Sequence, residues 1–161
     1  RGEVAPAPEL VASYASNDDR LAATYAYSGT SPYVIKYDDL ATGADNFMVI
    51  RYAEMYLIRA EANIHLEGNI LTIKDDINQV RQRAGLGNTP ASTYADLLTA
   101  IENERRLEFA FEGHRWFDLV RTGRAVDVLP TVTSINQTLF PIPLSELLTN
   151  TNPGMNQNPG Y

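Results

Sequence analysis

The stretch RYAEMYLIRAEA, Arg51 to Ala62, decides the fold of this chain. Apolar residues recur across it and its immediate flanks at spacings of 3, 4, 3 and 4, which is the period of one face of a helix. The residues of this stripe are Ile50, Ala53, Leu57, Ala60 and Ile64. Met55 and Ile58 widen the stripe, so we expect the helix to pack on more than one neighbour.

A second helix is predicted on the C-terminal side, from Thr72 to Ala84. Its apolar positions again follow the helical period, and they are Ile73, Ile77, Val80 and Ala84. Thr72, or the segment just before it, is a candidate cap for its start, and Gly85 favours its end. The first helix has Asn46 as a candidate cap, and Gly68 followed by Asn69 as its stop signal.

Two antiparallel helices with small residues at their contact resemble a tetratricopeptide hairpin, whose repeat is about 34 residues long. A single hairpin cannot bury both of its faces, so we expect it to stack on further helices.

A third, long helix is predicted from Ser92 or Thr93, either of which can cap it, to Val120. Gly113 interrupts its pattern, and we interpret this glycine as allowing a close helix approach or a local bend rather than an end. A broad apolar arc covers the helix, and its residues are Leu97, Ile101, Leu107, Phe109, Phe111, Trp116, Phe117 and Val120.

The predicted helices form a helical body, residues 46–125. The segments on either side of this body are rich in turn-forming residues. Residues 1–45 form a loop-rich segment in which Tyr33–Tyr37 is the best strand candidate. Residues 126–161 form a Pro- and Asn-rich tail, with a short turn of helix at Leu144–Leu148, and we expect this tail to wrap the helices. The predicted fold class is mainly α, with residues 1–161 forming one unit.

Composition and charge exclude several classes of function. The chain has 13 basic and 20 acidic residues, a formal net charge of −7, which disfavours both a nucleic-acid partner and an anionic membrane surface. Cysteine is absent, so disulfides and thiolate metal sites are excluded. The only histidines, His65 and His114, lack the spacing of a zinc site, and we expect no metal and no cofactor.

Residues 51–125 contain ten of the 13 basic residues, and nine of these ten are arginines. A catalytic interpretation makes Glu108 and Glu112 an acid/base pair on one helix face, as in glycoside hydrolysis. Neighbouring arginines would lower the pKa of these carboxyls, whereas a general acid needs a raised pKa, so we favour structural ion pairing. The candidates are Arg51, Glu54, Arg59, Glu61, Glu104, Arg105, Glu108, Glu112, Arg115 and Asp118, with the first four holding the first helix against the third.

Segments in one order along the chain resemble the C-terminal region of the SusD/RagB family of outer-membrane nutrient-binding lipoproteins. They are Arg51–Ala62, NQVRQRAGL at 78–86, ERRLEFAFEGHRWFDLVRTG at 104–123, and the pair LFPIP at 139–143 and NPGMNQNPGY at 152–161. The likeness covers roughly Asp18 to Tyr161. Chains of this family are several times longer, so we expect the present chain to be a fragment that lacks the lipid-anchored N-terminal half.

The resemblance implies a cell-surface, lipid-anchored outer-membrane protein that captures oligosaccharides or peptides. It implies a SusC-like TonB-dependent transporter as the partner, and no catalytic residue. Tyrosines in loops suit sugar binding because a flat ring with a polar edge matches the faces of a sugar. The ligand-binding candidates are Tyr25, Tyr27 and Tyr33. Two alternatives stay open: a helical-repeat scaffold for protein interaction, and, ranked last, a glycoside hydrolase.

Overall fold

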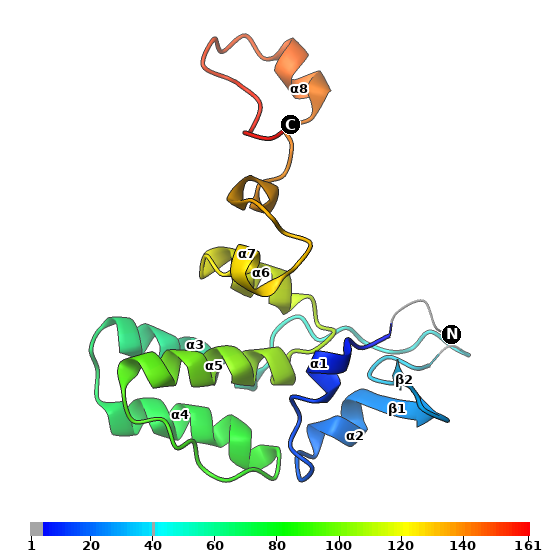
Figure 1. Ribbon diagram of the computed structural model, residues 1–161, viewed down its shortest axis with the longest axis vertical. Coiled ribbons are helices and arrows are strands. Elements are labelled where there is room, and N and C mark those ends of the chain that lie inside the picture. The colour runs from blue at the N-terminus through cyan, green and yellow to red at the C-terminus, as the bar shows by residue number, and fades with distance from the viewer. Residues whose placement is uncertain (1–4, 40) are drawn as a thin grey trace. The chain divides into compact units, whose positions relative to one another are not determined.

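The computed structural model describes residues 5–39 and 41–161 (Figure 1). It divides into two compact units, Arg1–Arg115 and Trp116–Tyr161. The first unit contains the short helices α1 (Pro8–Val11) and α2 (Arg20–Thr24), the strands β1 (Tyr25–Ser28) and β2 (Ser31–Val34), and the helices α3 (Tyr52–His65), α4 (Ile70–Arg83) and α5 (Tyr94–Glu108). Helix α6 (His114–Arg121) crosses the boundary, and the second unit continues with α7 (Ala125–Val128), the 3-10 helix η1 (Ile135–Thr138) and α8 (Leu144–Thr149). The mainly α class predicted from the sequence is confirmed.

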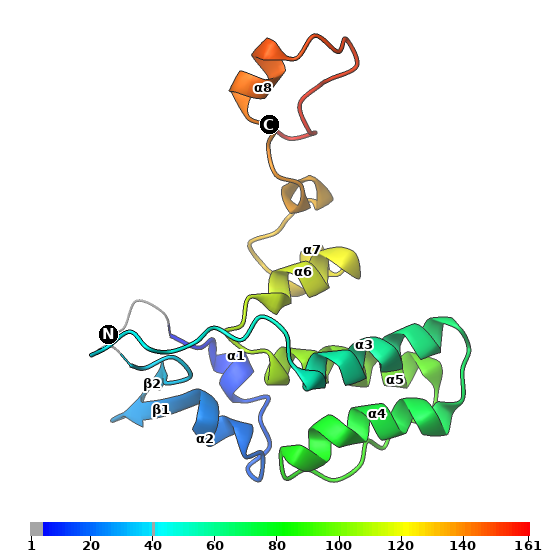
Figure 2. The same cartoon turned by 180° about the vertical axis from the view of Figure 1, so that it is seen from behind.

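Helices α3, α4 and α5 pack on one another and form the body of the first unit (Figures 1 and 2). Their core contains residues from the apolar stripe predicted for each helix: Leu57 of α3, Ile73 and Ile77 of α4, and Leu97 and Ile101 of α5. Each of these side chains is almost wholly removed from water. Burying a side chain of this size stabilises a fold by about 1.5–3 kcal/mol, so the stripes hold the three helices together.

Local signals set the ends of these helices. The Asn69 side chain accepts a hydrogen bond from the backbone N–H of Leu71 at 2.8 Å and caps α4, which begins just before the predicted Thr72. Thr93 caps α5 as predicted, since its Oγ1 accepts from the N–H of Asp96 at 3.2 Å. At the end of α3 the N–H of Gly68 donates to the carbonyl of Asn63 at 2.8 Å, which confirms the predicted stop.

The predicted start of the first helix at Asn46 is wrong. Helix α3 begins at Tyr52, and Arg51 has an extended backbone with φ −146° and ψ 156°. Ile50, which the periodicity places in the core, is 71 % exposed and lies in an irregular segment. The helical spacing of apolar residues extends into this segment, but the backbone is extended at Arg51 and becomes helical only from Tyr52.

The long third helix is also divided in the structure, into α5 and α6. Phe111 and Gly113 between them have positive φ angles of 64° and 83°, which end a right-handed helix. A Cβ placed at Gly113 would meet nothing within 4 Å, so the predicted close helix approach is wrong. The glycine is needed for its backbone conformation, which L-residues rarely adopt.

The loop-rich segment contains an antiparallel hairpin. The register pairs Tyr25 with Val34 and Ser28 with Ser31, and Gly29 in the turn has a φ of 60°. The predicted strand at Tyr33–Tyr37 is therefore displaced: β2 covers Ser31–Val34, and β1 was not predicted. In sequence, the aromatic residues of β1 are followed immediately by polar turn residues, which shortens the alternating pattern below the usual length of a strand signal.

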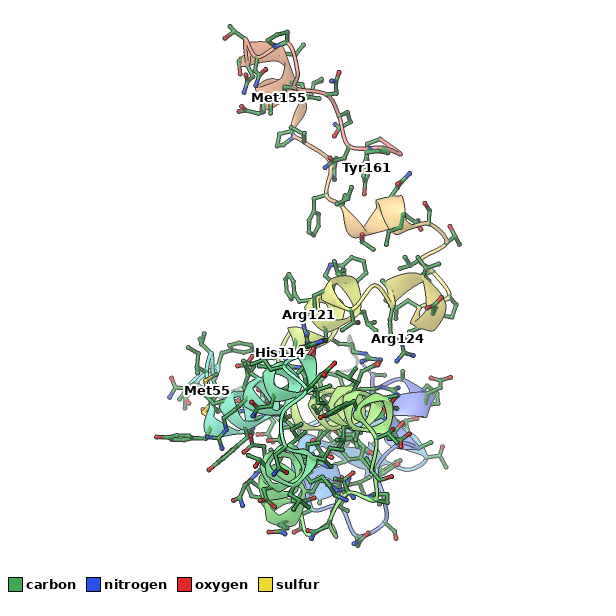
Figure 3. The ribbon with its side chains drawn as sticks, turned by 90° about the vertical axis from the view of Figure 1, so that its left-hand side faces the viewer. Met55, His114, Arg121, Arg124, Met155 and Tyr161 are labelled. Carbon is green, nitrogen blue, oxygen red and sulfur yellow. The ribbon has the colours of Figure 1, made fainter. Side chains whose placement is uncertain are left out.

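In the second unit, the end of the chain closes on itself. Gln157 makes two hydrogen bonds to the backbone of Ile142, one accepted at 2.7 Å and one donated at 2.9 Å. The Asn158 amide donates to the carbonyl of Phe140 at 2.7 Å, and the hydroxyl of Tyr161, labelled in Figure 3, donates to that of Leu139 at 2.9 Å. Amide side chains thus satisfy backbone groups in a proline-rich segment that cannot form a ladder.

Helix α8 confirms the short helix predicted at Leu144–Leu148. That the tail wraps the helices stays a prediction. In the part of the chain that the structure describes, we find no helix with the length and apolar character needed to cross a membrane.

Candidate functional site

Glu108, at the end of α5, lies at the centre of a buried cluster of charges. Its carboxylate accepts hydrogen bonds from Arg83 at 2.6 and 2.7 Å and from Arg20 at 3.2 Å, and a further one from Arg51. The Glu108 side chain is only 1 % exposed. An ionised carboxylate at such a site needs compensating cations, and three arginines from different elements supply them.

Arg20 of α2 is the most buried cation of this cluster. Its Nη2 donates to Asp18 at 2.7 Å and its Nη1 to Glu104 at 2.6 Å, and both carboxylates are buried. The second oxygen of Glu104 accepts from Arg81 of α4 at 3.2 Å. The loop-rich segment is therefore tied to the helical body by charge-assisted hydrogen bonds.

Arg51 connects the start of α3 to the turn after α5. Its Nε and Nη2 donate to the two oxygens of Glu112 at 2.9 and 2.8 Å, and its Nη1 donates to Glu108. Lys36, just after β2, also pairs with Glu112. The guanidinium lies 4.7 Å from the centre of the Phe109 ring, a cation–π contact that adds to the ion pairs.

The other predicted ion-pair residues are placed as follows. Glu54 lies 3.7 Å from Arg105 of α5 and 3.5 Å from Nδ1 of His114. Arg59 binds Asp76 of α4 at 2.5 and 2.9 Å and so faces the second helix rather than the third. Glu61 is half-buried on α3, Arg115 pairs with Glu102 at 3.2 Å, and Asp118 pairs with Arg121 at 2.9 Å.

These pairs decide what the carboxylates can do chemically. Burial alone raises the pKa of Glu108, but the hydrogen bond and charge of Arg51, with the charges of Arg83 and Arg20, outweigh burial and hold the pKa below its ordinary value. A hollow of about 300 Å³ is lined by Glu108 and Glu112, yet both carboxylates are bound to cations there. The geometry suits a structural anion rather than a general acid.

The three candidate ligand tyrosines do not form one surface. Tyr25 is 3 % exposed, and its hydroxyl donates to the carbonyl of Val11 at 3.2 Å, so it packs inside the first unit. Burial raises the pKa of Tyr25 to about 12. Tyr27 is 52 % exposed on the same strand face, whereas Tyr33 pairs with Ala26 and points to the opposite face. Tyr27 and Tyr33 could therefore contact ligands only on separate sides of the hairpin.

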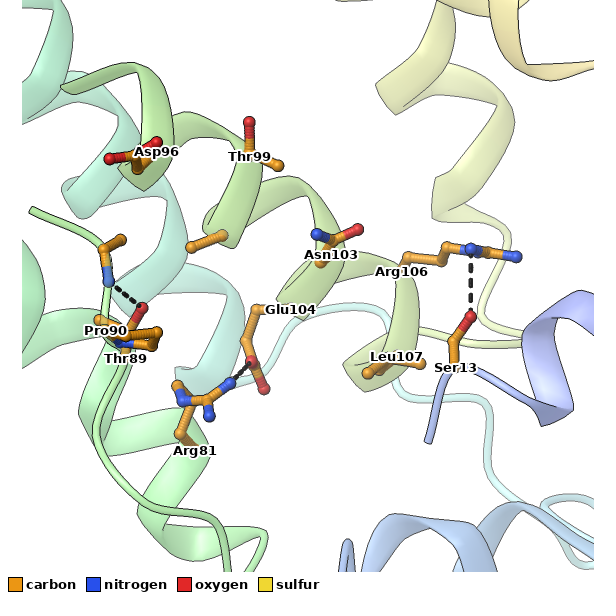
Figure 4. A pocket seen from close by; sticks show the side chains of 12 residues that line it. Ser13, Arg81, Thr89, Pro90, Asp96, Thr99, Asn103, Glu104, Arg106 and Leu107 are labelled. Carbon is orange, nitrogen blue, oxygen red and sulfur yellow. Dashed lines mark hydrogen bonds and ion pairs between the residues drawn. The ribbon is translucent and has the colours of Figure 1, made fainter. Parts of the chain in front are cut away.

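The sequence did not indicate a second, larger hollow beside α5. This groove has a volume of about 710 Å³ and runs between α5, the loop from Thr89 to Ala91 that precedes it, and Ser13 (Figure 4). Asp96, Thr99, Asn103 and Arg106 follow one another along the helix on the side of the groove. Their spacing of 3, 4 and 3 residues predicts a polar helix face from the sequence, but no sequence pattern predicts that a groove lies along that face.

Residues 11–130 of the chain match the family model described as the SusD family. The chain is 34% identical over 127 residues to SusD-like protein P38 of Formosa agariphila, and this match covers 72% of the chain and 25% of that protein. The chain thus spans about a quarter of the length of this relative.

Two solved structures are similar over nearly the whole chain. One is described as a laminarin binding SusD-like protein, with 34% identity and a TM-score of 0.74, covering 98% of this chain and 38% of that one. The other is surface glycan-binding protein A from Bacteroides thetaiotaomicron, with 26% identity and a TM-score of 0.71, covering 96% of this chain and 41% of that one.

Proposed function

The chain belongs to the SusD family, and from this premise we propose that it is part of a cell-surface protein that binds a nutrient glycan. One observation carries the proposal: the likeness to a laminarin-binding structure at 34% identity and a TM-score of 0.74 over 98% of the chain. The similarity to a surface glycan-binding protein supports the same class of ligand. Because function can differ within a fold, the ligand itself has to be found by experiment.

The proposal extends to the partner and the location. A SusC-like TonB-dependent transporter would receive the glycan, and the protein would sit on the outer membrane, held by a lipid anchor upstream of the present residues. Capture and hand-over require no bond cleavage, and the arginine-bound Glu108 and Glu112 are consistent with that requirement.

The test is a binding assay with the full-length protein and a panel of laminarin, starch and acidic uronate polysaccharides. We expect saturable binding of at least one neutral glycan, with no release of shortened products from any of them. Product release would contradict the proposal and favour a glycoside hydrolase. Binding of no glycan at all would also contradict it.

Tyr27 is the hairpin residue proposed to contact the glycan, because it is the candidate ring that is mostly exposed on β1. A stacking contact of about 1.4 kcal/mol corresponds to a tenfold change in affinity, so Tyr27→Ala should weaken binding about tenfold. Tyr33→Ala tests the opposite face of the hairpin in the same way. Tyr52→Ala is the control, since Tyr52 is an exposed tyrosine outside the hairpin, at the start of α3. An equal loss in all three variants would refute a specific role of the hairpin.

A second candidate function, a scaffold for protein interaction, is favoured by one feature of the surface. The segment before α3 and the first turns of that helix expose large apolar side chains, and these are Phe47, Met48, Val49, Ile50, Tyr52 and Met55 (Figure 3 labels Met55). Exposed apolar surface of this kind is typical of protein contact sites. Binding of a purified SusC-like transporter together with failure to bind any glycan would decide for this alternative.

A further inference from the structure

We propose that the groove between α5 and the loop Thr89–Ala91 is a binding subsite for a neutral oligosaccharide, distinct from the hairpin tyrosines. The inference rests on the proposed glycan-binding function and adds a place and a ligand chemistry to it. The volume of the groove, about 710 Å³, lies within the range of about 300–1,000 Å³ that is usual for ligand pockets.

One wall of the groove is a row of polar side chains on a rigid helix. Asp96, Thr99, Asn103 and Arg106 are separated by 3, 4 and 3 residues, so they lie on one face of α5 (Figure 4). The carboxylate accepts, the guanidinium donates, and the amide does both. Such a row matches the alternating donors and acceptors of a chain of sugar hydroxyls.

Two of these groups keep hydrogen-bonding capacity for a ligand. Arg106 Nη1 donates to Ser13 Oγ over 3.4 Å, the long end of hydrogen bonding, and a guanidinium has five N–H donors in all. Among the described residues, the Asn103 side-chain amide has no hydrogen-bond partner. By contrast, Thr99 uses its hydroxyl on the carbonyl of Ala95 at 3.1 Å. Arg106 and Asn103 are therefore the two residues expected to hold the ligand.

The opposite wall is held in place before any ligand arrives. The N–H of Thr89 donates to Oδ1 of Asn78 at 2.8 Å, and Thr89 itself is buried. Pro90 and Ala91 of this loop, with Leu107 of α5, add apolar lining that can contact the C–H faces of a sugar. A loop fixed in this way loses little conformational entropy on binding.

The charges in the groove favour a neutral ligand. Arg81 and Glu104, which both line the groove, form an ion pair at 3.2 Å, and the lining contains one further cation, Arg106, and one further anion, Asp96. Opposite charges in equal number give no strong potential for either an acidic or a basic ligand. A uronate chain or a charged peptide would bring an unpaired charge, whereas a neutral glycan would not.

The test is calorimetric titration of the full-length protein with four probes: a laminarin hexasaccharide, a maltohexaose, an acidic uronate hexasaccharide and a neutral hexapeptide. Hydrogen bonds to charged groups are stronger than those between neutral groups, so Arg106→Ala should weaken binding of the neutral glycan at least about tenfold. Asn103→Ala should weaken it less, and Arg106→Lys, which keeps the charge but loses the planar donor fork, should not restore full affinity.

Gln79→Ala is the matched control, since Gln79 is an exposed amide residue on α4 outside the groove, and it should bind as wild type. Unchanged urea midpoints will show that the variants are folded.

Each other outcome overturns a different statement. Binding of a neutral glycan that both groove variants leave within twofold of wild type would overturn the subsite and leave the proposed function intact. Binding of the uronate or the peptide alone, weakened by the same variants, would overturn the neutral-saccharide assignment. Failure of the wild-type protein to bind any glycan would overturn the proposed function and the subsite with it.

Discussion

Neutralising Glu108 tests whether the buried charges hold the first unit together. Glu108→Gln keeps the shape of the side chain but removes the negative charge that binds Arg20, Arg51 and Arg83. Breaking a buried pair usually costs about 3–5 kcal/mol because the remaining charge loses its partner.

The structure places the expected loss at the lower end of that range. Arg51 keeps both of its bonds to Glu112, and Arg20 keeps Asp18 at 2.7 Å, so neither cation is left without a carboxylate. The side chain of Arg83 is 59 % exposed, and its pair therefore contributes little. We expect the free energy of unfolding to fall by about 3 kcal/mol.

Urea unfolding followed by far-ultraviolet circular dichroism measures this loss. With a slope of about 1.5 kcal/mol per molar urea, a loss of about 3 kcal/mol lowers the midpoint by about 2 M. The control is Asp75→Asn, which neutralises an exposed carboxylate on α4 and should change stability by less than about 0.5 kcal/mol. A midpoint for Glu108→Gln as close to wild type as that of the control would refute the structural role of the cluster.

Three further predictions follow from the same structure. The pKa of Glu108 is lower in the folded chain than its ordinary value of 4.5, so the unfolded chain binds more protons at this group below that value. The contribution of Glu108 to stability should therefore be fully present above pH 4.5 and decrease as the pH falls further. Urea titrations at stepped pH measure this dependence, and Glu108→Gln should flatten it. Gly113→Ala should cost about 1–2 kcal/mol by thermal unfolding although the added methyl group meets no atom, because φ is 83°; an unchanged midpoint would argue against that backbone conformation. Ultraviolet titration should find a tyrosine with a pKa of about 12, and Tyr25→Phe should abolish that transition; its persistence would place Tyr25 in water.

The three main helices could be read from the sequence because their signals are local. Leu57, Ile77 and Leu97 recur with neighbours at helical spacing, and Asn69 and Thr93 satisfy backbone groups one to three residues away. Where a local signal continued past the true end of a helix, the prediction failed. The apolar run before Tyr52 has the helical period, and only the structure shows its side chains in water.

The candidate site was predicted only in part, because it depends on contacts between distant residues. Arg51 and Glu108 were named as ion-pair residues from their helices, but Arg20, which binds Glu104 from 84 positions away, had no local signal. Tyr25 and Tyr27 look alike in sequence, yet the fold buries one ring and exposes the other.

The order and type of the helices follow from residues that lie within a turn or two of one another. The motifs of the SusD family can be recognised in the sequence because they too are short and local. The partners of each arginine, the exposed tyrosine and the hollow beside α5 exist only once the chain has closed loops of many residues. Their energies depend on burial and on the geometry of groups that are far apart in the unfolded chain, so no pattern along the sequence records them.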